Sequence, residues 1–193
     1  MPAIKSDDFY PKLLALDWGK VKSFKAIVIH HSATPDNPKG YSWNAIRDHH
    51  MKVNGWTDIG YHVGCEMVDN QIAYLFGRPF YEYGSHAKNW NGGEHASIGL
   101  MACGNYGAYT AGEKSAETGK IVEEGSPELG IAPPEIIWDT MVYMACALKK
   151  IFREKRKQEL MIVGHRETYY PKPQEKSCPG YLWDMVKFRK EVQ

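Results

Sequence analysis

A short apolar run that ends in two histidines constrains the fold of this chain more than any other feature. Residues 24–31 contain Ile27-Val28-Ile29 followed by His30-His31, without an alternation of apolar and polar positions. We interpret this run as a β-strand that is apolar on both faces. Such a strand lies in the centre of a sheet, because both of its faces must be covered.

The other segments alternate between strand and helix patterns. We expect a helix over residues 43–53, with Ser42 as its N-cap and Asn54-Gly55 at its end. A hairpin and two single strands are predicted over residues 61–68, 71–76, 97–103 and 161–163. This alternation predicts an α/β fold with a single mixed β-sheet flanked by helices.

Two further helical patterns lie in the C-terminal half. Pro133-Pro134 precede the strongest one, in which apolar residues recur at helical spacing from Ile137 to Phe152 and a basic run follows. We expect the last helix to begin at Pro179 and to carry Leu182, Met185 and Val186. Both helices would pack an apolar face on the sheet.

The length and composition of the chain suit one domain. It has 193 residues, of which 43% are hydrophobic, and this is enough for a substantial core. We expect residues 1–22 to form an N-terminal arm and residues 23–193 to form a single domain. Residues 104–132 are rich in Gly, Ser and Glu without apolar periodicity, so we predict a long loop insertion there.

Charge and hydropathy exclude several classes of partner. A formal net charge of +1 gives no reason to expect nucleic-acid binding, and no apolar run approaches the roughly 20 residues of a membrane-spanning helix. The apolar stretch Leu13-Leu14-Ala15-Leu16 is shorter than the core of about 7–15 residues in a signal peptide, so we expect synthesis in the cytoplasm. The four cysteines are widely scattered, and we expect no disulfides.

A histidine and a cysteine near the C-terminus suggest a metal site. His165 follows an apolar strand pattern, and Cys178 comes thirteen residues later on a proline-rich turn. His30 or His31 ends the first strand and could supply a third ligand; strand alternation sends only one of the two toward the site. Two imidazoles and one thiolate would leave one zinc position open for water, as in catalytic rather than structural zinc sites. Each of these residues taken alone is more typical of a hydrogen-bonded histidine or a buried thiol.

Five ordered motifs give the chain a family resemblance. They are Ile-His-His-Ser-Ala-Thr (29–34), Trp-Thr-Asp-Ile-Gly-Tyr-His (56–62), Gly-Ser-His-Ala-Lys (84–88), Ser-Ile-Gly (97–99), and Gly-His-Arg-Glu (164–167) with Lys-Ser-Cys-Pro (176–179). Over residues 24–190 the chain resembles the zinc-dependent N-acetylmuramoyl-L-alanine amidases of the phage-lysozyme type (amidase type 2 family), relatives of the peptidoglycan recognition proteins. The resemblance implies the peptidoglycan recognition protein-like amidase fold.

The resemblance also implies the roles of particular residues. His30, His165 and Cys178 would hold one Zn²⁺ per chain, and Tyr61 and Lys176 would be catalytic. Lys176 could stabilise the oxyanion of amide hydrolysis, and Tyr61, with a pKa lowered by the nearby cations, could position or deprotonate the water. Which group is the base stays open.

A loop between the predicted strands offers candidate substrate contacts. We expect His86, Trp90 and Asn91 to line the substrate groove, because an imidazole, an indole face and an amide can grip a glycan-peptide. An exposed loop without such a role would explain the same residues. The predicted substrate is peptidoglycan.

These observations predict hydrolysis of the amide bond between N-acetylmuramic acid and L-alanine. We expect a monomeric phage or prophage endolysin that is made in the host cytoplasm and acts on the cell wall after release. The alternatives are a non-catalytic peptidoglycan-binding module and a related amidase that acts on soluble muropeptides or as an antibacterial effector. Groove shape decides between such substrates, and sequence does not reveal it.

Overall fold

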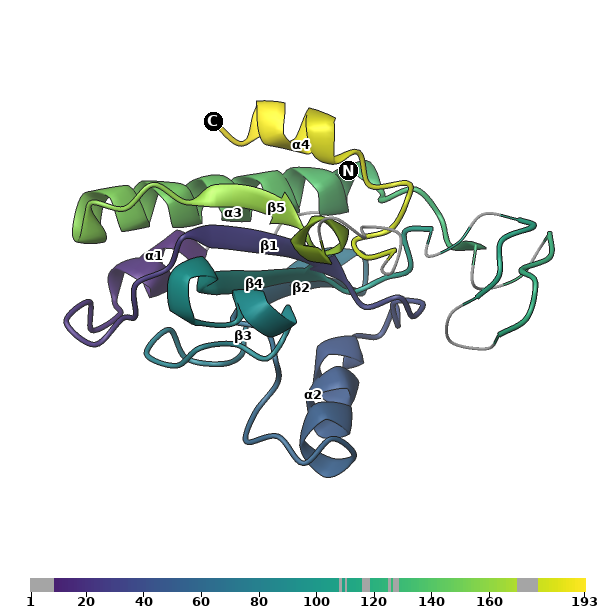
Figure 1. Cartoon of the computed structure of the whole chain (residues 1–193), viewed down its shortest axis with the longest axis horizontal. Coiled ribbons are helices and arrows are strands. Elements are labelled where there is room, and N and C mark those ends of the chain that lie inside the picture. Colours follow the sequence, from purple (N-terminus) through teal and green to yellow (C-terminus); the bar gives the residue numbers. More distant parts are fainter. Residues whose placement is uncertain are drawn as a thin grey trace.

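The computed structural model contains one five-stranded mixed sheet. It describes residues 9–107, 109, 111–115, 119–124, 126, 129–169 and 177–193. The strands are β1 (Ala26–His31), β2 (Val63–Val68), β3 (Gln71–Phe76), β4 (Ser97–Ala102) and β5 (Met161–Gly164). Their order is β3-β2-β4-β1-β5; β2 and β3 are antiparallel, and the other neighbouring pairs are parallel (Figure 1). The predicted α/β class is confirmed.

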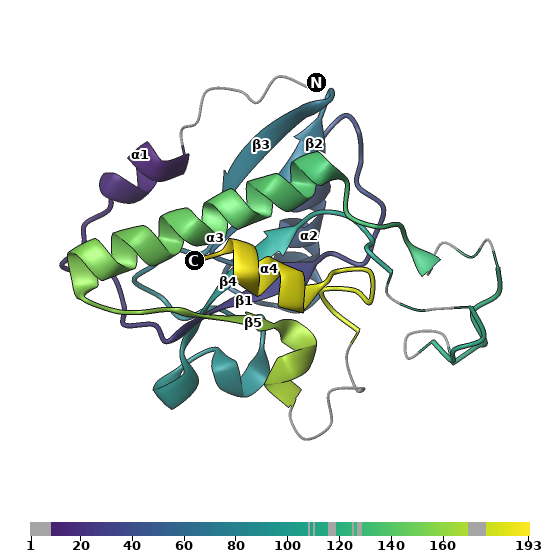
Figure 2. The same ribbon diagram turned by 90° about the horizontal axis from the view of Figure 1, so that it is seen from above.

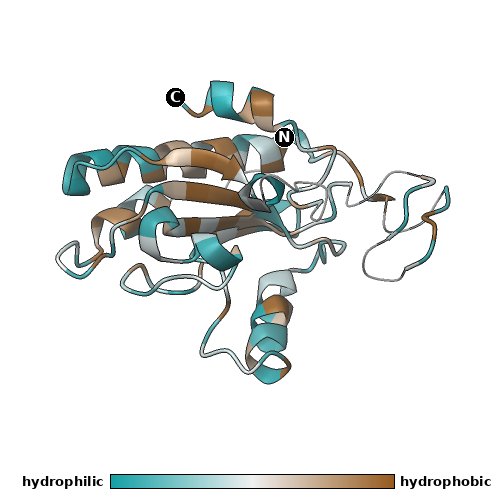
Figure 3. Cartoon of the chain, in the orientation of Figure 1, coloured by the Kyte–Doolittle hydropathy of each residue, from teal (hydrophilic) through white to brown (hydrophobic). Residues whose placement is uncertain are grey.

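The predicted first strand lies where its composition requires. β1 pairs with β4 on one side and with β5 on the other, and each of its six residues is buried. Apolar residues concentrate on the strands and on the helices packed against them (Figure 3). An apolar run without alternation therefore predicted the centre of the sheet correctly.

Helices cover both faces of the sheet. The α-helices among the described residues are α1 (Phe9–Leu14), α2 (Ser42–Lys52), α3 (Glu135–Arg156) and α4 (Met185–Glu191). Short 3₁₀ turns include η1 (Lys88–Trp90), η2 (Gly93–His95) and η4 (His165–Tyr169). α3 and α4 lie on one face and α2 on the other (Figure 1). Seen from above, α3 runs along the sheet with α4 beside it (Figure 2). The buried side chains of α3 recur at the predicted helical spacing and include Ile137, Met141, Met144, Leu148 and Ile151.

Two helix starts differ from the prediction. Ser42 does not cap α2: the helix begins at Ser42 itself, and the Glu66 carboxylate on β2 accepts the Trp43 N–H at 3.0 Å. The last helix begins at Met185 rather than at Pro179. The Asp184 side chain caps it by accepting the N–H groups of Val186 and Lys187. The cap of α2 is a tertiary contact from β2, and the cap of α4 is a local contact five residues after the predicted start.

The described part of the predicted arm joins the core. Phe9 and Leu13 of α1 are fully buried, and Phe9 packs against Tyr74 and Tyr143. The described residues of the 104–132 segment form no α-helix and no strand beyond an isolated bridge between Lys114 and Ile121. They extend to one side of the sheet (Figure 1).

Two further findings concern the described residues. No helix among them is both long enough and apolar enough to cross a membrane. All four cysteines, at positions 65, 103, 146 and 178, are free thiols.

Candidate active site

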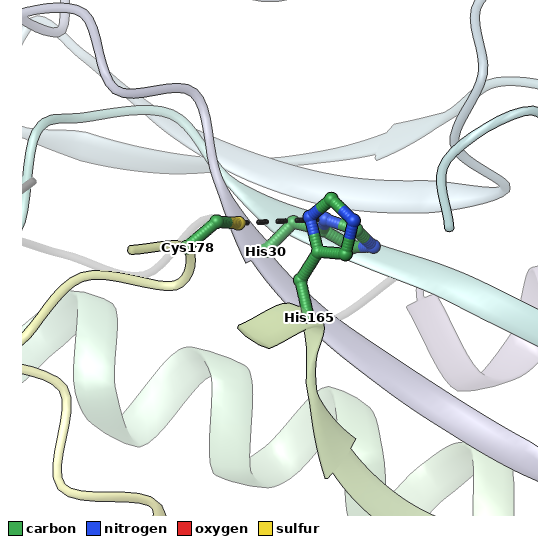
Figure 4. A group of neighbouring side chains, drawn as sticks. All are labelled: His30, His165 and Cys178. Carbon is green, nitrogen blue, oxygen red and sulfur yellow. Dashed lines mark hydrogen bonds between the residues drawn. The ribbon is translucent and has the colours of Figure 1, made fainter. Parts of the chain in front are cut away.

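Three predicted ligands meet at the carboxyl ends of two neighbouring strands. Ile29 of β1 pairs in register with Gly164 of β5. The next residue on each strand, His30 and His165, therefore lies beside the other at the edge of the sheet. Cys178 reaches the same point from the turn before α4, with its Sγ 3.5 Å from His30 Nδ1 (Figure 4). One potential ligand atom from each of the three residues lies within 4.8 Å of the others.

This donor set fits a zinc ion. Zinc binds imidazole nitrogen at about 2.0–2.1 Å and thiolate sulfur at about 2.3 Å, which places two such donors about 3.6 Å apart around a tetrahedral ion. The 3.5 Å between His30 Nδ1 and Cys178 Sγ agrees with this value. Burial holds the pKa of His30 well below its usual range, and the charge of His165 is the second cause. His30 is therefore neutral, which is the form that binds metals.

The alternative between the two adjacent histidines has a structural answer. His31 lies on the opposite side of β1 from the cluster, where its Nδ1 accepts the Tyr106 N–H at 3.1 Å. His30 is the one that lies beside His165, with ring centroids 4.5 Å apart. The alternation of side chains along a strand separates the two.

Arg166 holds the turn that carries Cys178. Its backbone N–H donates to the Cys178 carbonyl at 2.7 Å, and its guanidinium donates to the carbonyls of Gly180 (2.7 Å) and Trp183 (3.4 Å). The neighbouring Glu167 accepts the Gly164 N–H at 2.7 Å and pairs with Arg189 of α4. The Gly-His-Arg-Glu motif thus positions the turn that carries Cys178 and the end of β5 that precedes His165, and its sequence alone did not indicate this role.

We expect Arg166→Gln to lower zinc affinity by about 10- to 100-fold, the usual loss when a group that orients a metal ligand is removed. Glutamine cannot replace the guanidinium fork that holds the Gly180 and Trp183 carbonyls. A competition titration with a chromophoric chelator measures the change. Arg153→Gln is the matched control, because Arg153 pairs with Glu159 on an exposed part of α3. Unchanged affinity in Arg166→Gln would show that Cys178 is held without it.

Tyr61 lies beside the predicted ligands. Its ring centroid is 4.9 Å from that of His30. Tyr61 lies just before β2, and its backbone carbonyl accepts the Arg78 N–H at 2.9 Å. The buried Arg78 guanidinium also donates to the carbonyls of Ile59 and Asp58, which fixes the backbone before Tyr61. Burial raises the pKa of Tyr61 above its usual range. Burial in the protein therefore favours the protonated phenol, in contrast to the prediction from sequence that cationic neighbours lower the pKa of Tyr61.

A groove passes Tyr61 along one side of α2. Its volume is about 670 Å³, and it is lined by residues that include Ser32, Thr34, Tyr41, Ile46, His49 and Tyr61. A more apolar cavity of about 470 Å³ lies elsewhere, between Tyr106, Ile131 and Ile137. The groove is the better candidate for a substrate site because Tyr61 lines it. The predicted oxyanion group, Lys176, lies outside the described residues.

The three predicted substrate contacts are buried or partly buried. His86 is 8% exposed, with one ring nitrogen 3.0 Å from His30 Nε2 and the other 3.2 Å from the Ser97 carbonyl oxygen. Asn91 Oδ1 accepts the N–H groups of His86 and Ala87, both at 2.8 Å. Trp90 is partly buried and stacks on His95, with centroids 4.8 Å apart. His86 is thus buried rather than part of an exposed loop, and substrate contact by His86, Trp90 or Asn91 stays a prediction.

A second cluster of potential ligand atoms has a structural explanation. It consists of Asp36, Glu66 and Cys103. Asp36 accepts the Met67 N–H and the Ser42 hydroxyl, both at 2.8 Å, and Glu66 caps α2. These carboxylates hold the start of α2 against β2, and thereby one wall of the groove.

Comparisons with known proteins identify similar chains. The family model described as N-acetylmuramoyl-L-alanine amidase matches residues 20–181. Peptidoglycan-recognition protein LB of Drosophila melanogaster is 31% identical over 106 residues, which cover 47% of this chain and 42% of that protein. The chain thus covers less than half the length of this curated relative.

Solved structures share the fold. Bumblebee PGRP-SA superposes with a TM-score of 0.54 at 20% identity, covering 95% of this chain and 90% of that one. The Ph2119 endolysin from the Thermus scotoductus MAT2119 bacteriophage Ph2119 has a TM-score of 0.51 at 19% identity, covering 89% and 88%. At such identities the likeness concerns the fold, and it confirms the expected type of α/β architecture.

Proposed function

The chain belongs to the N-acetylmuramoyl-L-alanine amidase family, and on this premise we propose that it is a zinc-dependent enzyme that hydrolyses the bond between N-acetylmuramic acid and L-alanine in peptidoglycan. The observation that carries the proposal is the cluster of His30, His165 and Cys178 next to a groove lined by Tyr61. Membership confirms the resemblance seen in the sequence. The activity of this member is our proposal.

His30, His165 and Cys178 would hold the metal. Three protein ligands are typical of catalytic zinc, whereas structural zinc has four. A zinc ion bound there supplies a Lewis acid for the amide carbonyl and lowers the pKa of water to about 7. The neutral state of His30 and its distance from Cys178 support this assignment.

The remaining chemistry falls to the side chains around the cluster. In hydrolysis, water oxygen bonds to the carbonyl carbon, the C–N bond breaks, and a proton moves to the departing L-alanine nitrogen. Since burial favours the protonated phenol, Tyr61 suits the donation of a hydrogen bond to the developing oxyanion. Lys176, for which the family resemblance implies a catalytic role, would stabilise the same oxyanion as a cation.

We expect the protein to release stem peptides with a free L-alanine amino terminus from purified peptidoglycan, and to do so only with metal present. Mass spectrometry of digests with and without a strong zinc chelator measures this, and zinc added after the chelator should restore release. Intact muramyl–alanine linkages despite stoichiometric zinc would contradict the proposal. They would favour a binding module or a different amide substrate.

The biological role we propose is that of a phage or prophage endolysin, made in the host cytoplasm and acting on the wall after release. The shared fold with a bacteriophage endolysin supports this at the level of architecture. Export of the intact protein from growing cells by its own signal would contradict it.

A further inference from the structure

His86 forms a buried connection between His30 and the backbone. His86 Nδ1 lies 3.0 Å from His30 Nε2, and the two rings are nearly perpendicular, at 89°. On its other side, His86 Nε2 lies 3.2 Å from the Ser97 carbonyl oxygen. Both residues are buried, with His30 1% and His86 8% exposed.

These contacts determine where the protons lie. A carbonyl oxygen only accepts hydrogen bonds, so His86 Nε2 must carry the proton and donate to Ser97. In a neutral imidazole the other nitrogen then accepts, so His86 Nδ1 accepts from His30 Nε2–H. The lone pair of His30 is left on Nδ1, the atom that lies 3.5 Å from Cys178 Sγ.

Two glycines leave the space that the His86 ring occupies. A Cβ atom on Gly84 would lie 2.4 Å from His86 Cδ2, and one on Gly99 would lie 2.8 Å from the same atom, so only glycine leaves room for the ring at these positions. Asn91 accepts the His86 N–H and fixes its backbone, while the Ser97 hydroxyl donates to the Trp90 carbonyl. Two of the motifs around residues 84–88 and 97–99 thus serve one buried side chain.

We propose that His86 is a positioning residue that holds His30 in its Nε2–H tautomer and thereby directs the lone pair of Nδ1 to the metal position. The inference rests on the proposed zinc site and adds a residue to it. Groups that bond to the second nitrogen of a metal-binding histidine fix its tautomer and orientation, and their removal typically costs about 10- to 100-fold in metal affinity. Here the fixing group is a second histidine anchored to the backbone.

The tautomer can be measured directly in the metal-free wild-type protein. Long-range ¹H–¹⁵N correlation spectra of histidine-labelled protein distinguish Nε2–H from Nδ1–H imidazole. We expect both His30 and His86 to be neutral Nε2–H tautomers near pH 7. A His30 that carries its proton on Nδ1 would overturn the proposal, whatever the protein hydrolyses.

Two nearly isosteric variants separate positioning from packing. His86→Asn keeps an acceptor oxygen close to the position of Nδ1, whereas His86→Leu has a similar shape without an acceptor, so both lose similar packing. We expect His86→Leu to bind zinc about 10- to 100-fold more weakly than wild type and His86→Asn to stay closer to wild type. His95→Asn and His95→Leu, at an exposed position, are the matched controls and should leave affinity unchanged.

Each outcome of the zinc titration has a defined meaning. Equal loss in His86→Asn and His86→Leu would reduce His86 to a packing residue, and no loss in either would remove it from the site. If neither variant folds, the wild-type tautomer decides. Normal zinc binding with the expected tautomer but intact peptidoglycan would refute the proposed amidase activity and leave the role of His86 standing.

Discussion

Cys178→Ser should abolish stoichiometric zinc binding and lower kcat/KM on peptidoglycan by about a thousandfold or more. Serine is not ionised near neutral pH, so the substitution removes the only thiolate from the proposed ligand set. Loss of the metal removes several kcal/mol of transition-state stabilisation, and each ~1.4 kcal/mol is a factor of ten in rate. Zinc content by mass spectrometry of the native protein and peptide release together measure the effect.

The fold should survive this substitution. Cys178 is only half-buried, and its backbone carbonyl still accepts the Arg166 N–H. Cys146→Ser is the matched control, because Cys146 lies on α3, also half-buried, near the C-terminal backbone rather than the cluster. A Cys178→Ser protein with full activity and full zinc content would refute the ligand assignment. Loss of activity in both variants would point to a general effect of losing a thiol.

The convergence of the candidate ligands could be predicted from the sequence for a physical reason. Parallel strands present their carboxyl ends at one edge of a sheet, so His30 near the end of β1 and His165 directly after β5 were expected at the same edge, and the pairing of β1 with β5 brings them together. The apolar runs that identify these strands are local signals. Cys178 follows no such strand pattern; its thiol and its place on a proline-rich turn made it a candidate ligand, and the family motif supported it.

The role of His86 could not be predicted in the same way. A histidine between Gly84-Ser85 and Ala87-Lys88 has the local composition of an exposed loop, yet the ring is buried beneath His30. Its environment is made by Gly99 and Ser97 on β4, and their approach depends on the fold of the whole sheet. Glycines that leave room for one ring were the available signal, and their spacing in sequence does not reveal that they share a neighbour.

The start of α2 shows the same limit. Ser42 has the residue type of an N-cap, but its hydroxyl donates to Asp36 at 2.8 Å. Glu66 from β2 accepts the Trp43 N–H instead. Local preference therefore predicted the start of the helix to within one residue and missed the group that caps it, because a tertiary contact replaced the local one.

Tyr61→Phe is expected to lower kcat on peptidoglycan by about 10²- to 10³-fold while zinc affinity stays unchanged, an effect typical of losing one hydrogen-bond donor to an oxyanion. Phenylalanine keeps the ring contacts with His30 and Trp43, so the cluster should stay in place. KM should change little, because the lost interaction forms only in the transition state. Steady-state kinetics on a soluble muropeptide, together with a zinc titration, measure both quantities.

The comparison with a second tyrosine makes this test specific. Tyr81→Phe removes the same hydroxyl at an exposed position and should leave kcat unchanged. A Tyr61→Phe protein with wild-type kcat would exclude the phenol from the chemistry and leave the predicted oxyanion role to Lys176 alone. If zinc affinity falls together with kcat, the hydroxyl acts by holding the cluster, because the ring that packs on His30 is the same in both proteins. A fall in kcat with unchanged zinc affinity is expected only if the phenol takes part in the reaction itself.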